Sequence, residues 1–205
     1  MIKIFTFNAS VLEDEALFEK YLKKVSPYRL EKIRSLKFKR DKMLSLAASI
    51  AIDKGLNEYS LFEKDMTYEK NKYGKPYFAP FPDIHFSLSH SGTMAIAAFS
   101  DREVGCDIEK LRSVDLKIAE RFFCPEEKQY INSHTDPCFA FLRLWTLKES
   151  FLKALGLGLS RPLDSFCINI SGDKAENLKT EDGHEYSFFE QTLDDHRIAA
   201  CEIIT

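Results

Sequence analysis

The stretch Val104–Lys110, Val-Gly-Cys-Asp-Ile-Glu-Lys, constrains the fold of this chain more than any other. Its apolar and polar residues alternate, which is the pattern of a β-strand with one buried face. Asp107 and Glu109 are two residues apart and therefore share a face, where two carboxylates repel each other unless a positive charge lies between them. A divalent cation meets this need, because Mg²⁺ takes oxygen ligands from carboxylates together with substrate phosphates. The alternative is a solvated strand end, since Asp-x-Glu is a short and common pattern.

A third carboxylate, Glu149, belongs to a helix that the apolar periodicity predicts over residues 137–155. Trp145, Glu149 and Lys153 recur every fourth residue and therefore lie on one helix face. This spacing places a carboxylate and an ammonium group on a single wall. We expect Glu149 to complete an acidic cluster with Asp107 and Glu109. The alternative for Glu149 and Lys153 is a surface ion pair, worth about 0.3 kcal/mol.

The composition is that of a globular protein with little net charge. The chain has 205 residues, of which 44% are hydrophobic and 30% charged, and its net charge is −3. This length suits one domain or two small lobes. The weak negative charge gives no general attraction for nucleic acid or anionic lipid, and no apolar run is long enough to span a bilayer. We therefore expect a monomeric, cytoplasmic protein that binds neither nucleic acid nor membranes.

The cysteines give no sign of a disulfide framework or a zinc site. Five are present, widely spaced, with no Cys-x-x-Cys pair. An odd number of scattered cysteines predicts reduced and mostly buried thiols.

Three segments offer cations or small polar residues that could meet an anion. The densest basic group lies in segment 34–42, which is either an anion site or a solvated helix face: Arg34, Lys37, Lys39, Arg40 and Lys42. Lys75 lies between Gly74 and Pro76, so a turn presents it. Ser89 and His90 end a predicted strand just before Gly92, where a phosphate can approach closely. The alternative for His90 is a turn histidine bonded to the backbone.

Strands and helices are expected to follow one another along the whole chain. The predicted strands cover residues 2–7, 84–89, 94–99, 103–108, 166–170, 186–190 and 197–203. The predicted helices cover residues 11–25, 31–55, 113–123 and 137–155, with Ser26-Pro27 as a start signal and Gly55 as a helix end. Residues 100–102 are expected to join two strands as a hairpin-like turn.

Taken together, the order of these motifs resembles the phosphopantetheinyl transferases. The likeness is to the single-chain, two-lobed class, typified by the surfactin-synthetase activator, that serves nonribosomal peptide and polyketide synthetases. It covers residues 28–170 in one collinear order. The matching segments are Gly74–Pro76, Phe86–Ser91, Gly105–Lys110, Arg121–Phe123, Trp145–Lys153 and Pro162–Phe166.

The resemblance implies an α/β (α+β) fold of two similar lobes with a pseudo-twofold relation, residues 1–100 and 101–205, with the active site in the cleft between them. It implies transfer of the 4′-phosphopantetheine arm of coenzyme A to a serine of an acyl or peptidyl carrier protein, with release of adenosine 3′,5′-bisphosphate. Nonribosomal peptide, polyketide and fatty acid biosynthesis use such carriers. The sequence does not choose among these pathways.

The resemblance also assigns roles to individual residues. Asp107, Glu109 and Glu149 are implied as ligands of Mg²⁺, with Mn²⁺ as the alternative. Lys153 is implied as the partner of the pyrophosphate. The implied coenzyme A contacts are Lys75, Ser89 and His90.

The sequence departs from the family pattern at Leu44, where an arginine usually meets the 3′-phosphate of the nucleotide. Arg40 or Lys42 is expected to substitute. The catalytic group is expected to comprise Glu149, Lys153 and Glu109. The base that deprotonates the acceptor serine is either Glu149 or a water bound near Glu109.

Two other functions remain open from the sequence. One is a different Mg²⁺-dependent phosphoryl-transfer or hydrolytic enzyme, and the other is a catalytically silent protein that binds coenzyme A or carrier proteins. If carriers bind, a local basic and apolar patch has to attract them, because the chain is net negative. Lys117, Arg121 and Phe122 offer such a patch.

Overall fold

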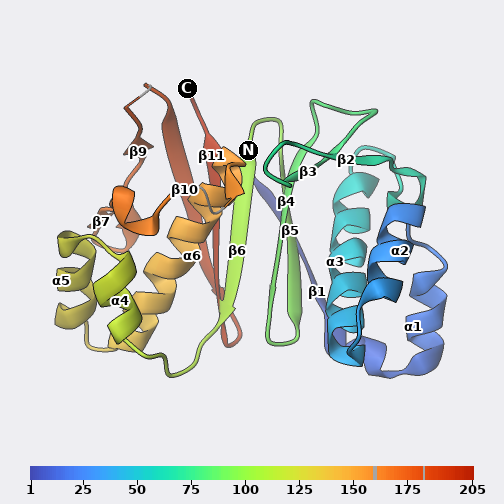
Figure 1. Ribbon diagram of the computed structural model, residues 1–205, viewed down its shortest axis with the longest axis horizontal. Helices are drawn as coiled ribbons and strands as arrows, with labels where there is room; N and C mark the ends of the chain where they lie inside the picture. Colours follow the sequence, from blue (N-terminus) through green and yellow to red (C-terminus); the bar gives the residue numbers. More distant parts are fainter. Residues whose placement is uncertain (159–160, 182) are drawn as a thin grey trace.

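Two antiparallel sheets stand side by side in the computed structural model, which describes residues 1–158, 161–181 and 183–205. The first sheet has the order β1-β5-β4, formed by Lys3–Asn8, Met94–Ser100 and His85–Ser91. The second has the order β6-β11-β10-β9, formed by Val104–Lys110, His196–Ile203, Glu185–Leu193 and Leu178–Lys179. Helices cover the outer side of each sheet, and β4 and β6 meet in the middle (Figure 1). The α/β fold class is confirmed. The predicted boundary at residue 100 falls at the end of β5, and a twofold relation between the halves stays a prediction.

The helices of the first half differ from the prediction at two breaks, one at Asp14 within the helix predicted over 11–25 and one within the helix predicted over 31–55. They are α1 (Glu15–Leu22), α2 (Pro27–Ser35) and α3 (Lys39–Asn57), preceded by a 3-10 turn, η1 (Ala9–Glu13). Ser26 caps α2 by accepting a hydrogen bond from the amide of Arg29, as the start signal predicted. The single helix predicted over 31–55 is wrong, because the backbone is extended at Leu36 and Phe38. Gly55 does not end α3 but lets the helix pack against Phe99, whose ring a side chain at this position would overlap.

The helices of the second half are α4 (Lys117–Phe122), α5 (Pro125–Ser133) and α6 (Pro137–Leu155). The bounds of α6 match the prediction. Asp136 caps its start by accepting from the amide of Phe139, and Gly156 ends it with φ +65°, a conformation that glycine adopts at low cost. Shorter elements complete the fold: η2 (Glu63–Asp65), β2 (Tyr68–Lys70), β3 (Pro76–Phe78), η4 (Leu163–Ser165), β7 (Ile170–Ser171) and β8 (Lys174–Ala175).

The hairpin predicted between β5 and β6 is wrong, because these two strands belong to different sheets. β6 lies beside β4 instead, where the described residues form no main-chain ladder. Alternate serine hydroxyls of β4 bridge the gap, and we call Ser87, Ser89 and Ser91 the serine bridge. Ser87 accepts from the amide of Cys106 at 3.0 Å, and Ser91 accepts from the amide of Lys110 at 3.1 Å. β4 therefore continues through Ser91, two residues beyond its predicted end, and carries polar groups up to the acidic strand.

The cysteine prediction fails for one pair. Cys124 and Cys167 form a disulfide, with Cα atoms 5.9 Å apart. They are 43 residues apart in the chain, so no local spacing revealed that the start of α5 lies beside the segment after η4. Cys106, Cys138 and Cys201 are free thiols. No described helix is both long and apolar enough to cross a bilayer, and the cytoplasmic location stays a prediction.

Gly105 allows β6 and α6 to touch backbone to backbone. A Cβ atom at this position would overlap the carbonyl oxygen of Ser150 and the amide nitrogen of Ala154. We predict that Gly105→Ala lowers the free energy of unfolding by about 3 kcal/mol, because neither rigid backbone can yield without displacing α6. Urea denaturation measures the change.

Gly172→Ala is the matched control, because its Cβ atom would meet nothing within 4 Å. It adds only the strain of a left-handed residue, about 1 kcal/mol. Equal losses for the two variants would contradict the close contact of β6 with α6.

Candidate active site

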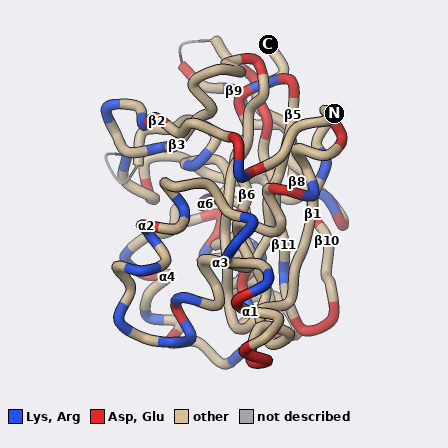
Figure 2. The backbone as a smooth tube through the Cα atoms, turned by 90° about the vertical axis from the view of Figure 1, so that its right-hand side faces the viewer, with Lys and Arg blue, Asp and Glu red and all other residues tan. Residues whose placement is uncertain are grey.

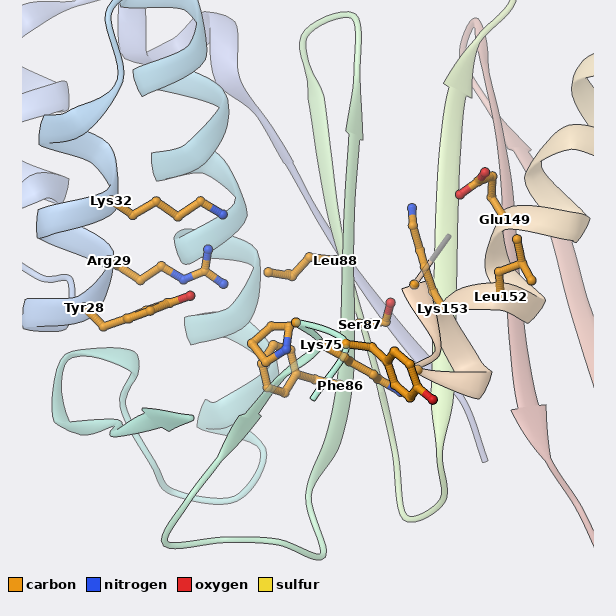
Figure 3. Close-up of a pocket in the computed structure, with 15 residues that line it drawn as sticks. Tyr28, Arg29, Lys32, Lys75, Phe86, Ser87, Leu88, Glu149, Leu152 and Lys153 are labelled. Atoms are coloured by element: carbon orange, nitrogen blue, oxygen red, sulfur yellow. The ribbon is translucent and has the colours of Figure 1, made fainter. Parts of the chain in front are cut away.

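A cavity of about 380 Å³ lies between α2 and α6 (Figure 3). Tyr28, Arg29 and Lys32 of α2 line one side, and Glu149, Leu152 and Lys153 of α6 line the other. The turn before β3 forms a further wall, with Tyr73, Gly74, Lys75 and Pro76. Arg29 and Lys32 extend from α2 toward the side that carries Lys153. Cations from both halves of the chain thus face one space.

A second cavity, of about 460 Å³, adjoins the first. The two share four lining residues, Arg29, Lys32, Leu88 and Lys153. The second adds a more polar wall, with Asp41, Ser45, Ser89 and His90. Lys153 therefore lies where the two cavities meet.

Lys153 and Asp107 form the central ion pair of the site. The Lys153 Nζ atom lies 2.7 Å from Asp107 Oδ1 and 3.1 Å from Ser89 Oγ. The Ser89 hydroxyl also donates to Asp107 Oδ1 at 2.7 Å. The other carboxylate oxygen, Asp107 Oδ2, is buried without a hydrogen-bond partner. A buried oxygen of this kind is unfavourable unless a donor or a cation satisfies it.

The remaining carboxylates of the predicted cluster lie near this ion pair in an environment that favours their neutral forms. Burial raises the pKa of Glu109, and the charge of Asp107 raises it further. Burial likewise raises the pKa of Glu149, with smaller contributions from Asp107 and Glu109. Burial lowers the pKa of Lys153, but the surrounding acidic groups, Asp107 foremost and Glu149 among them, together outweigh this, so the net shift is upward and the ammonium stays charged. More positive charge here would stabilise all three carboxylates.

The acidic cluster is spread out rather than closed. Among the described residues, Asp107, Glu109 and Glu149 do not form a group whose ligand atoms all lie within 4.8 Å of one another. Lys153 neutralises Asp107 directly, while Glu109 accepts from the hydroxyl of Ser91 at 3.0 Å. The oxygen donors and the unpartnered Asp107 Oδ2 nevertheless suit a hard divalent cation.

Arg29 and Ser45 were missed by the sequence analysis, as was Lys32. Arg29 is only 2% exposed, its Nε atom has no hydrogen-bond partner, and no described carboxylate lies within ion-pair distance of it. The Ser45 hydroxyl is also buried and unpartnered. Burial lowers the pKa of Lys32, and the charges of Arg29 and Lys70 lower it further. The available signal was the three-residue spacing of Arg29 and Lys32 on a helix that Ser26 starts.

His90 completes this group of basic residues. Burial lowers the pKa of His90, and the nearby charges of Lys153 and Lys32 act in the same direction. An anion in the second cavity would relieve this repulsion. Figure 2 shows Lys and Arg recurring along α2, beside the helix α3 that carries Ser45.

Two of the predicted anion contacts are differently placed. Arg40 donates to the carbonyl of Gly92 at 3.3 Å and lines a separate cavity beside Leu44, and Lys42 lines neither cavity of the site. The break at Leu36 explains this, because α3 starts a new helical face that does not continue that of α2. Lys75 lines the first cavity, but its ammonium is bonded to Glu103 at 2.7 Å.

The predicted carrier patch lies on α4, away from the two cavities. Lys117 begins this helix, and Arg121 lies near its end, over the ring of Phe122. Phe122 is partly buried against the core, and Phe123 belongs to the core with 2% exposure. The charges of the patch are therefore its accessible part.

Comparisons with known proteins agree with this geometry. The model of the 4′-phosphopantetheinyl transferase superfamily matches residues 103–201. The 4′-phosphopantetheinyl transferase Sfp of Bacillus subtilis (strain 168) is 34% identical over 191 residues, which cover 89% of this chain and 84% of that protein. The transferase psf-1 of Bacillus pumilus is 33% identical over 210 residues, covering 98% of this chain and 89% of that protein. The mouse L-aminoadipate-semialdehyde dehydrogenase-phosphopantetheinyl transferase is 29% identical, covering 89% and 68%.

This chain is related to these enzymes over most of its length, and it has two helix-covered sheets with an acid–lysine site between two cavities. It belongs to the 4′-phosphopantetheinyl transferases. Within that family its likeness is to the Sfp type, the surfactin-activator-like class. The resemblance drawn from the motifs is confirmed.

Proposed function

We propose that this transferase binds coenzyme A across the two cavities and transfers its phosphopantetheine arm to a carrier-protein serine, with Mg²⁺ as cofactor. The position of Lys153 is the observation that carries the proposal. Its ammonium faces both cavities and is held by Asp107 of the acidic strand. If the pyrophosphate of coenzyme A lay at this junction, its nucleotide and its phosphopantetheine arm would extend from it in opposite directions.

Asp107, Glu109 and Glu149 are the proposed ligands of Mg²⁺, and Mn²⁺ would suit the same oxygen donors. The unpartnered Asp107 Oδ2 and the raised pKa values of Glu109 and Glu149 support a cation here. When bound, the metal would neutralise pyrophosphate charge and polarise the phosphoryl oxygens.

The protein's own groups have distinct tasks in the transfer. Lys153 donates to the pyrophosphate and stabilises the negative charge that moves to the leaving phosphate. Ser89 orients Lys153 and Asp107 through its hydroxyl. The acceptor serine loses its proton to Glu149, or to a water that passes it on to Glu109.

The second cavity suits the 3′-phosphate of coenzyme A. Arg29 and Lys32 supply charge, Ser45 supplies an unpartnered hydroxyl, and His90 becomes a second donor when it gains a proton. These four residues would together replace the arginine of the family pattern, whose position is occupied here by Leu44.

The first prediction for function concerns the acidic strand. Asp107→Ala should lower the rate of transfer by about 10²- to 10³-fold, the scale of losing one electrostatic stabiliser, and should remove Mn²⁺ binding. Intact mass of an apo carrier protein after incubation with coenzyme A and Mg²⁺ reports transfer, and the paramagnetic resonance of Mn²⁺ reports the metal.

Asp83→Ala, which removes an exposed acid that lines neither cavity, is the control. Wild-type transfer by Asp107→Ala would refute the metal assignment. An unmodified carrier together with free phosphopantetheine would identify a hydrolase instead, and coenzyme A binding without either product would identify a silent binding protein.

The second prediction separates the two assignments of the 3′-phosphate. Lys32→Ala should raise KM for coenzyme A about tenfold, because a charged hydrogen bond is lost, while KM for 3′-dephospho-coenzyme A stays unchanged. Arg40→Ala is measured in parallel. If Arg40→Ala selectively raised KM for coenzyme A and Lys32→Ala did not, Arg40 rather than Lys32 would be assigned to the 3′-phosphate.

The third prediction concerns the carrier protein. We propose that Lys117 and Arg121 attract its acidic surface, since a net charge of −3 gives no general attraction. Lys117→Glu with Arg121→Glu should raise KM for the carrier and weaken its dependence on salt, with KM for coenzyme A unchanged. Equal losses for both substrates would indicate a damaged fold, and no loss would place the carrier on another surface.

A further inference from the structure

The ammonium of Lys75 already has its full set of hydrogen-bond acceptors. Its Nζ atom lies 2.7 Å from Glu103 Oε2, 3.1 Å from the carbonyl oxygen of Val104 and 3.3 Å from that of Ala154. A lysine ammonium has three donors, and three oxygens account for them. The side chain is only 18% exposed, so the arrangement is held within the protein rather than in solvent.

One of these acceptors belongs to the last turn of α6. Carbonyl groups in the last turn of a helix lack partners within the helix, and the helix dipole favours a cation there. Lys75 meets both needs at Ala154, which directly follows Lys153. The charge of Lys75 therefore acts on the helix that carries the central lysine of the site.

Asn71 binds the same end of α6. Its Oδ1 atom accepts from the amides of Tyr73 and Lys75 at 2.9 and 3.0 Å, which shapes the turn. Its Nδ2 atom donates to the carbonyl of Gly156 at 2.8 Å. A side chain at Gly156 would come within 3.0 Å of the Lys75 stem, so turn and helix end fit closely.

The turn and α6 come from different halves of the chain, and both line the first cavity. The contact of Asn71 and Lys75 with residues 154–156, here called the turn–helix contact, therefore sets the distance between two cavity walls. Glu103 in turn fixes Lys75. A hydrogen bond from His85, together with the charge of Lys75, lowers the pKa of Glu103 to about 2, so this carboxylate stays ionised.

We propose that Lys75 and Asn71 are positioning residues, which hold the end of α6, and with it Lys153, against the first cavity. In this role the Lys75 ammonium does not bind a phosphate of coenzyme A. The proposal rests on the proposed binding of coenzyme A in this cavity. It gives Lys75 a different role from the one that the motif resemblance implied.

Glu103→Gln tests the proposal because the two roles predict opposite results. If Lys75 positions α6, loss of the Glu103 charge loosens the turn–helix contact, and kcat/KM for coenzyme A falls about tenfold, as small displacements of catalytic groups can cause. If Lys75 is a phosphate ligand, the same change frees its ammonium, and kcat/KM for coenzyme A stays the same or rises. KM for the carrier protein should remain unchanged in the first case.

Two further variants keep the test independent of any single substitution. Asn71→Asp retains the acceptor that shapes the turn but loses the donor to Gly156, and it should show the same selective loss. Lys75→Met should show a loss that Glu103→Gln does not increase, because both remove one interaction. Glu58→Gln is the matched control, since it breaks the exposed Lys3–Glu58 pair of 2.8 Å and should change none of these constants.

Amide hydrogen exchange gives a readout that does not depend on activity. Asn71→Asp and Glu103→Gln should each accelerate exchange at the last turn of α6, including the amide of Gly156, and leave α3 unchanged. Faster exchange together with lower kcat/KM supports the proposal. Unchanged exchange, or an unchanged or higher kcat/KM for coenzyme A in Glu103→Gln, overturns it. If the variants exchange faster but the wild-type protein transfers no phosphopantetheine, the proposed function is rejected, while the structural role of the turn–helix contact is supported.

Discussion

The backbone contact between β6 and α6 at Gly105 is the constraint on which the site depends. No side chain separates strand and helix there, so the backbone of α6 is in direct contact with the backbone of the acidic strand. Lys153 can reach Asp107 at 2.7 Å only because the helix is this close. The glycine of the Gly-x-Asp-x-Glu motif therefore has a steric task, while the two acids have an electrostatic one.

The junction between the sheets adds a second constraint. Buried carboxylates and amides at β6 need partners, and the serine bridge supplies them from β4. Each hydroxyl can both donate and accept, which allows Ser91 to serve the Lys110 amide and Glu109 together. The acids are therefore oriented from the first half of the chain and neutralised from the second, so the site requires both halves.

Much of this arrangement could be predicted from the sequence where local signals are strong. The bounds of α6 follow from a capping aspartate, a proline at the first position and a glycine at the end. The shared face of Asp107 and Glu109 follows from strand alternation. The break between α2 and α3 was missed because Leu36 to Phe38 contain neither proline nor glycine. Arg29 and Lys32 lie on α2, before this break, and no motif marked them in the sequence. The sheet membership of β5 and β6 and the Cys124–Cys167 disulfide depend on contacts between distant segments, which spacing along the chain does not encode.

The serine bridge also limits how the two halves can move. A slide of β4 along β6 would break all its hydrogen bonds at once, and a slip of one residue would turn every hydroxyl to the wrong face. Apolar side chains of β5, β6 and β11 pack as one buried cluster across the same junction, including Ile96, Cys106 and Ile198. The two sheets are therefore fixed against each other by polar bonds and by a shared core, so the spacing of α2 and α6 across the cleft is set by the fold itself.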